Sequence, residues 1–269
     1  MKDVQGERDT RNIPIDRVGV CGVSYPLVVM DPHENVQHVT ASVTMSVSLP
    51  KDFRGTHMSR FIEVLESCRG NMTLGNLEEI VEALKTQLDA PEAEITVSFP
   101  YFIRRAAPVS GAESYSRTDV EFWAVKAERF DFILKVGVPV QTLCPCSKEI
   151  SEYGAHNQRA RVEIEIRMKR LVWIEELVAV AEESASAPVL TLLKREDEKA
   201  LTELAFSNPR FVEDVVREIS MKLDLDGRIK WYRVSVVSDE SIHNHQAFAS
   251  LERTVRHSAD RDLGERCGR

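Results

Sequence analysis

Alternation between apolar and small polar residues is the feature that most limits what this chain can fold into. From Val39 to Leu49 every odd position is apolar and every even position is serine or threonine. A two-residue period places the two sets of side chains on opposite faces of a β-strand, so this segment predicts a strand with one face in a core. An earlier apolar run at 18–30 is separated from it by the turn-like composition DPHEN.

The same order of elements is predicted twice along the chain. In the first half, two strands, two amphipathic helices and two further strands are expected at 18–30, 39–49, 57–68, 77–88, 95–99 and 118–125. In the second half the corresponding ranges are 130–140, 162–168, 171–183, 208–219, 231–237 and 248–251. The sequence therefore predicts an α+β fold with two tandem ββααββ units at 1–127 and 128–256, followed by a flexible tail at 257–269.

Each predicted unit is an antiparallel sheet with two helices on one face. The other face is left uncovered, which predicts that copies of the chain associate to close it. The last helix is expected to begin at Asn208-Pro209, because asparagine is a good N-cap and proline suits the first turn.

Composition excludes several classes of protein. The 43% hydrophobic and 29% charged content is that of a globular protein, and no run approaches the roughly 18 apolar residues that a membrane span needs. A formal net charge of −8 argues against non-specific nucleic-acid binding. The charged start of the chain lacks the apolar core of a signal peptide, which favours a cytoplasmic protein. Five scattered cysteines, an odd number, indicate reduced thiols.

The segment TLCPCSKEISEYGAHNQR, residues 142–159, concentrates the candidate chemistry. It follows a predicted strand, and its prolines indicate a loop or bulge. Cys144 and Cys146 are poor disulfide partners, since one intervening residue forces the bridge away from its preferred geometry. Burial as two small apolar residues is the plainer alternative. With His156 twelve residues on, a thiolate and an imidazole suit Zn²⁺ or a similar metal, although two ligands do not complete a site.

Other candidates each have a simpler alternative. His243 and His245 fall on one side of an extended segment, or in an ordinary polar turn. Glu198 stands in a charge run that is most simply a solvated face, and Glu213 borders the apolar arc of its helix, where surface residues also lie. The helix opening at His57–Arg60 could contact a phosphate, or it could simply be capped by Thr56. Basic residues that could reverse the local charge in a pocket are Lys148, Arg159 and Arg161.

Taken together, these motifs resemble one enzyme family. The segment CPCSKEISEYGAHNQR (144–159) is similar to the signature of the type IB GTP cyclohydrolase I family, metal-dependent enzymes of bacterial folate synthesis. The likeness extends over most of the chain, through KDVQ, IPIDRVGV, RGTHMSRF (54–61), LLKREDE (192–198), NPRFVED (208–214) and SIHNHQAF (241–248).

This resemblance implies the tunnelling fold, in which ββααββ units assemble into an oligomeric barrel, here from a homotetramer. It implies that Cys144, His156 and Glu198 bind a divalent metal, which in this family is Zn²⁺, Mn²⁺ or Fe²⁺. Cys144 and His243 are then the catalytic residues, with His243 a candidate for proton transfer. Cys146 matches the motif without an assigned ligand role.

The implied substrate is GTP, which is opened at C8, loses formate and recloses as 7,8-dihydroneopterin triphosphate. The resemblance gives Glu213 the role of anchoring the guanine ring. Arg60, Lys148 and Arg159 are our candidates for the triphosphate. A site with three protein ligands leaves a position for water, whose pKa the metal lowers.

Two rival functions remain open at this point. Another tunnelling-fold enzyme, such as a nitrile reductase with a cysteine nucleophile, would need NADPH and no metal. A non-catalytic structural metal site would need four closed ligands and no adjacent pocket.

Overall fold

The computed structural model describes residues 5, 7–69, 72–73 and 75–255. The predicted tail at 257–269, with Cys267, lies outside them. Two compact units are present: Met1–Tyr101 with Val120–Leu134, and Phe102–Asp119 with Lys135–Arg269. Our sequence-based division near residue 127 follows the repeat of elements and stays a prediction. Among the described residues, no helix is long and apolar enough to cross a membrane.

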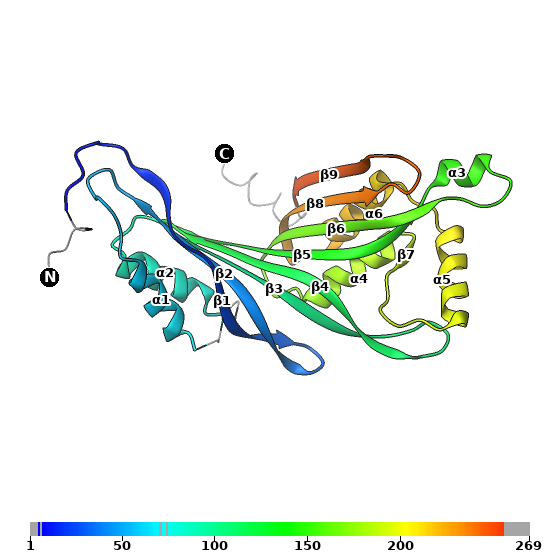
Figure 1. The fold of residues 1–269 in the computed structure, drawn as a ribbon, viewed down its shortest axis with the longest axis horizontal. Coiled ribbons are helices and arrows are strands. Elements are labelled where there is room, and N and C mark those ends of the chain that lie inside the picture. Colours follow the sequence, from blue (N-terminus) through cyan, green and yellow to red (C-terminus); the bar gives the residue numbers. More distant parts are fainter. Residues whose placement is uncertain (1–4, 6, 70–71, 74, 256–269) are drawn as a thin grey trace, which may run out of the picture. The chain divides into compact units, whose positions relative to one another are not determined.

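The first unit is built on long antiparallel strands. Strands β1 (Ile15–Asp31) and β2 (Asn35–Leu49) form a hairpin, and β2 pairs antiparallel with β3 (Ala93–Ala106). Helices α1 (Met58–Ser67) and α2 (Leu77–Gln87) pack against each other on one side of these strands (Figure 1). The alternation predicted for 39–49 is confirmed from position 41 onward, where the odd residues are buried.

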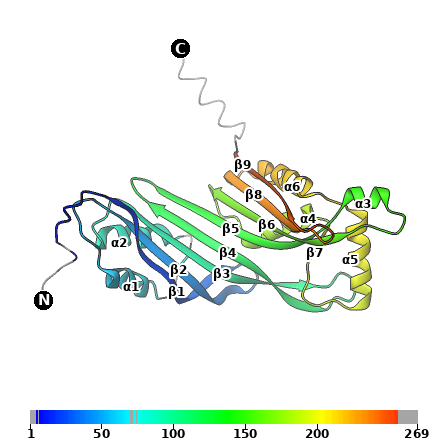
Figure 2. The same ribbon diagram turned by 45° about the horizontal axis from the view of Figure 1, so that its top comes forward.

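The second unit repeats this arrangement with additions. Its elements are the part of β5 (Phe130–Leu143) from Lys135 onward, α3 (Pro145–Ile150), β6 (Asn157–Met168), α4 (Ile174–Ser184), β7 (Ala187–Pro188), α5 (Arg195–Ser207), α6 (Val212–Leu225), β8 (Ile229–Asp239) and β9 (Gln246–Thr254). Helices α4 and α6 pack together, and α6 covers β8 and β9 (Figure 2). With β4 (Glu113–Lys126), hydrogen-bonded neighbours follow the order β1-β2-β3-β4-β5-β6-β8-β9, and β7 pairs with β5. The predicted α+β class is confirmed.

Three local expectations were wrong. Residues 145–150 form a short helix rather than a loop, because Cys144 serves as N-cap and proline suits the first turn. The charge run at 194–199 is not simply a solvated face: it opens α5, and its Asp197 is fully buried. Helix α6 begins after Phe211, whose backbone N–H is capped by Asp214. Asn208 instead ends α5, and its side-chain amide donates to the Ala185 carbonyl (2.8 Å).

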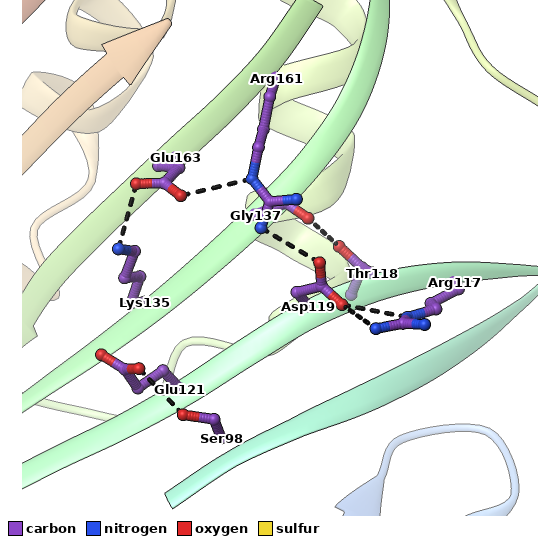
Figure 3. Close-up of polar contacts among 9 residues, drawn as sticks. All are labelled: Ser98, Arg117, Thr118, Asp119, Glu121, Lys135, Gly137, Arg161 and Glu163. Carbon is purple, nitrogen blue, oxygen red and sulfur yellow. Dashed lines mark hydrogen bonds and ion pairs between the residues drawn. The ribbon is translucent and has the colours of Figure 1, made fainter. Parts of the chain in front are cut away.

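Charged residues line the face of the strands that is opposite the buried face. In the second unit, Asp119 accepts hydrogen bonds from Arg117 and Arg161, and Glu163 pairs with both Arg161 and Lys135 (Figure 3). Gly137 leaves space for this network, because a Cβ there would lie 2.7 Å from Arg161 Nη2. In the first unit, Ser98 donates to Glu121 in the same manner (Figure 3). Exposed ion pairs contribute only about 0.2–1 kcal/mol each to the free energy of unfolding. The buried apolar face of the strands therefore supplies most of the stability, rather than the charged face.

Glycine is required at one position of β1. A Cβ added to Gly19 would overlap the carbonyl oxygen of Met45 on the paired strand, in a short regular stretch between two interruptions of the β1–β2 register. Backbone cannot move aside as a side-chain end can. We therefore expect Gly19→Ala to lower the free energy of unfolding by about 1–3 kcal/mol. The measurement is a urea titration.

Gly227→Ala is the control for this prediction. A Cβ placed on Gly227 would have no atom within 4 Å, so the free energy of unfolding should change by less than about 0.5 kcal/mol. Equal urea midpoints for the two variants would contradict the account given for Gly19.

Candidate metal and substrate site

The connection between β5 and β6 brings Cys144 and His156 together. The Cys144 N–H donates to the His156 carbonyl (3.1 Å), which closes the segment into a hairpin-like connection. Ser147 holds it from inside: its hydroxyl donates to the Cys144 carbonyl (3.2 Å) and accepts from the His156 N–H (3.2 Å). The Cys144 sulfur accepts the Ser147 N–H (3.4 Å). Among the described residues all cysteines are free thiols, in agreement with the exclusion of a Cys144–Cys146 disulfide.

The imidazole of His156 is oriented by a short polar chain. Its Nδ1 lies 2.9 Å from Oε1 of Gln158, whose Nε2 donates to Glu240 (3.4 Å). Because Glu240 accepts from the amide nitrogen, the amide oxygen faces the ring, and Nδ1 must carry the hydrogen. Nε2 of the neutral imidazole is then left as the lone-pair nitrogen. An oriented histidine of this kind suits metal binding.

The loop after β8 lies beside the same imidazole. Ser241 Oγ is 3.4 Å from Nδ1 of His156, and Ser238 Oγ donates to Glu240 (3.0 Å). Further along this loop, the rings of His243 and His245 are stacked, with centroids 5.2 Å apart and planes 7° apart. Both imidazoles are exposed. The structure thus joins the loop that carries His243 to the connection that carries His156.

Glu198 lies in the first turn of α5, on the wall of a pocket of about 340 Å³. The helix is seated by Leu201 and Ala205, which pack against Leu143 and Ala187. Across the described residues, no three or more His, Cys, Asp or Glu side chains are placed to hold a metal. A single chain therefore pairs Cys144 with His156 but does not gather all three predicted ligands. The pocket is lined from β6 by the residues that follow His156, namely Asn157, Gln158 and Arg159.

Two of the predicted basic residues have partners within their own unit. Lys148 Nζ donates to the Phe206 carbonyl at the end of α5 (2.6 Å) and lies 4.6 Å from the centre of the Phe206 ring. Arg60 belongs to the first unit, where its guanidinium donates to the Gln87 carbonyl (2.9 Å). Arg159, by contrast, lines the pocket, and its guanidinium makes no hydrogen bond or ion pair within the part of the chain that the structure describes.

Glu213 and Cys146 do not line this pocket. Glu213 is in the first turn of α6, beside the buried Val212 and next to Asp214. Cys146 is exposed in α3, one residue beyond Pro145. In a single chain neither is in the wall of the pocket that holds Glu198.

Three polar residues around the site were not expected from the sequence. Gln158 and Glu240 orient His156, and Asp197 fixes the start of α5. Gln158 stands within the 144–159 motif, two residues after His156 and so on the same side of a strand, which was the available signal. Asp197 occupies the third helical position after Lys194, a capping position that sequence spacing could have indicated.

Comparison with known proteins settles the family. A model of the "Type I GTP cyclohydrolase folE2" family matches residues 1–249. The chain belongs to this family. The GTP cyclohydrolase FolE2 of Kosmotoga olearia is 56% identical over 253 residues, which cover 94% of this chain and 98% of the relative. FolE2 of Geotalea uraniireducens is 51% identical over 256 residues, which cover 95% of this chain and 94% of the relative. These matches confirm the resemblance inferred from the motifs. Enzymes of this family are metal-dependent in general.

Solved structures with a similar fold are urate oxidases. A uricase from Bacillus fastidious aligns with a TM-score of 0.53 at 9% identity, over 94% of this chain and 96% of the other. A mutant of Bacillus sp. TB-90 urate oxidase aligns with a TM-score of 0.51 at 12% identity, over 89% and 98%. At this identity the likeness concerns the fold alone, and it confirms the predicted tunnelling fold.

The contacts of Lys148 lead to a stability prediction. Lys148→Met keeps most of the side-chain length but removes the hydrogen bond to Phe206 and the cation–π contact, so it should lower the free energy of unfolding by about 1 kcal/mol. Arg159→Met, which loses no hydrogen bond or ion pair within the described chain, should change the free energy of unfolding by less than about 0.5 kcal/mol. Urea titrations of both variants provide the measurement. A midpoint for Lys148→Met equal to that of wild type would leave Lys148 free for another role.

Proposed function

We propose that this protein is a GTP cyclohydrolase I, which converts GTP and water to 7,8-dihydroneopterin triphosphate and formate at the start of tetrahydrofolate synthesis. The observation that carries the proposal is the match to the FolE2 family over residues 1–249, with relatives more than 50% identical over nearly the whole chain. We place the enzyme in the cytoplasm, as a homotetramer.

Cys144, His156 and Glu198 are the proposed metal ligands. A thiolate, an imidazole and a carboxylate form a mixed donor set that Zn²⁺ accepts and that also suits Mn²⁺ or Fe²⁺. Two observations support the fit: the backbone bond that pairs Cys144 with His156, and the chain through Gln158 that leaves Nε2 of His156 as the donor nitrogen. When bound, the cation supplies Lewis-acid activation of the attacking water. Glu198 lies on the same pocket as Gln158, which favours it as the third ligand.

The remaining proposed roles belong to binding and proton transfer. Glu213 accepts a pair of N–H donors from the guanine edge, which holds C8 at the metal and makes the attack effectively unimolecular. His243 moves protons, a task suited to imidazole because it ordinarily titrates near neutral pH. Arg159 is the preferred triphosphate contact, because Lys148 is engaged with α5. Arg60 stays a second candidate in the first unit.

Activity with and without metal tests the proposal directly. Protein loaded with Zn²⁺ or Mn²⁺ should release one formate per GTP and yield a pterin that fluoresces after oxidation. Removing the metal with a chelator should abolish both products, and restoring it should recover them. Folded, metal-loaded protein that releases no formate would overturn the proposal, and NADPH consumption with a nitrile substrate would favour the reductase alternative.

Glu213→Gln tests the guanine contact. An amide presents only one acceptor oxygen, so one of two charge-assisted hydrogen bonds is lost and kcat/KM for GTP should fall by about tenfold or more. The fold should be unaffected, because the side chain is exposed. Glu128→Gln makes the same chemical change at an exposed position between β4 and β5 and should leave kcat/KM unaltered. Unchanged kinetics in Glu213→Gln would remove this residue from the site.

A further inference from the structure

Asp197 is a fully buried carboxylate inside an otherwise exposed charged segment. Its Oδ1 accepts the backbone N–H groups of Val109 and Ser110 (both 2.9 Å). Its Oδ2 accepts the Ser110 hydroxyl (2.6 Å) and the Lys194 N–H (2.9 Å). Burial would raise the pKa of Asp197, but these four donors hold it well below its ordinary value.

Three of the four donors come from a distant part of the chain. Val109 and Ser110 form the tip of the β3–β4 hairpin, which belongs to the same compact unit as α5. Figures 1 and 2 both show this tip beside α5. The tip is itself shaped by a bond from the Ala107 N–H to the Ala112 carbonyl (2.9 Å) and by Gly111 at φ +67°. Helix capping requires only the Lys194 bond, so the contacts to the hairpin have another consequence.

That consequence is the position of the first turn of α5. The buried apolar residues of α5 are Leu201 and Ala205, which lie one turn apart. Its last turn is held by Lys148 at the Phe206 carbonyl. Non-directional packing at two neighbouring positions leaves rotation and sliding of the first turn poorly restrained, whereas three directed hydrogen bonds from the hairpin tip to a buried carboxylate restrain both.

We propose that Asp197 is a positioning residue that locks the first turn of α5 onto the β3–β4 hairpin tip and so presents Glu198 to the pocket. Adjacent helical residues point about 100° apart, which lets Asp197 face inward while Glu198 faces outward. The inference rests on the proposed metal role of Glu198. According to this proposal, the tip of the β3–β4 hairpin contributes to metal binding although it supplies none of the proposed ligands.

Asp197→Asn is the main test, and Asp214→Asn is its matched control. Asp214 occupies the equivalent capping position in α6, where its carboxylate accepts the Phe211 N–H. An amide at position 197 cannot accept all four donors, because its nitrogen only donates. We expect the affinity for Zn²⁺, measured by chelator competition, to fall at least tenfold in Asp197→Asn and to stay within about 1.5-fold of wild type in Asp214→Asn.

Amide hydrogen exchange separates this role from general destabilisation. The Val109, Ser110 and Lys194 amides should exchange faster in Asp197→Asn, with or without metal, while core amides of β8 keep their protection. Ser110→Ala, which removes a single side-chain donor, serves if Asp197→Asn does not fold; it should weaken Zn²⁺ binding about threefold.

Each outcome has a distinct meaning. Folded Asp197→Asn protein that binds Zn²⁺ as wild type does would overturn the positioning role, as would an unaltered affinity in Ser110→Ala if only that variant folds. Wild-type protein that neither binds metal nor releases formate would instead overturn the proposed function. In that case faster exchange at the hairpin tip would still support the contact between Asp197 and the hairpin, without its role in metal binding.

Discussion

Antiparallel pairing of long strands, each with one buried face, is the constraint on which the rest of this molecule depends. Because side chains alternate, the buried residues of β2 and β6 leave polar or charged neighbours on the opposite face. Charged neighbours are paired across strands, as Arg161 is with Asp119. Burial in a β-sheet therefore fixes which positions are free for chemistry before any site is considered.

Candidate chemistry accordingly gathers where strands end. Cys144 follows the last residue of β5, His156 precedes the first of β6, and His243 lies between β8 and β9. At these places the backbone is not committed to a regular ladder, so one hydrogen bond from Cys144 to His156 and the side chain of Ser147 determine the local geometry. Gln158 then sets which nitrogen of His156 is available. Hydrogen-bond partners of this kind orient a metal ligand and tune its affinity for the metal.

The neighbouring residues Asp197 and Glu198 show how burial gives two carboxylates different roles. Both are carboxylates in one turn of α5, yet one is surrounded by four donors and the other lines a pocket. A buried carboxylate without partners would be strongly destabilising, so the hairpin tip and Asp197 stabilise each other's position. Glu198, left exposed, keeps its oxygens for a ligand, the role we propose for it.

The sequence by itself determined the strands, most helices, the repeat and the family. Local patterns were sufficient for these elements: an apolar run for β1, a two-residue period for β2 and helical spacing for α2. The motif at 144–159 was distinctive enough to indicate the family. Only the tertiary structure decided that Asp197 anchors the start of α5 to the β3–β4 hairpin, that Asn208 ends α5 rather than beginning α6, and that Lys148 is bound to Phe206. In each case the deciding partner lies tens of residues away in the sequence, and the contact with it outweighs local propensity.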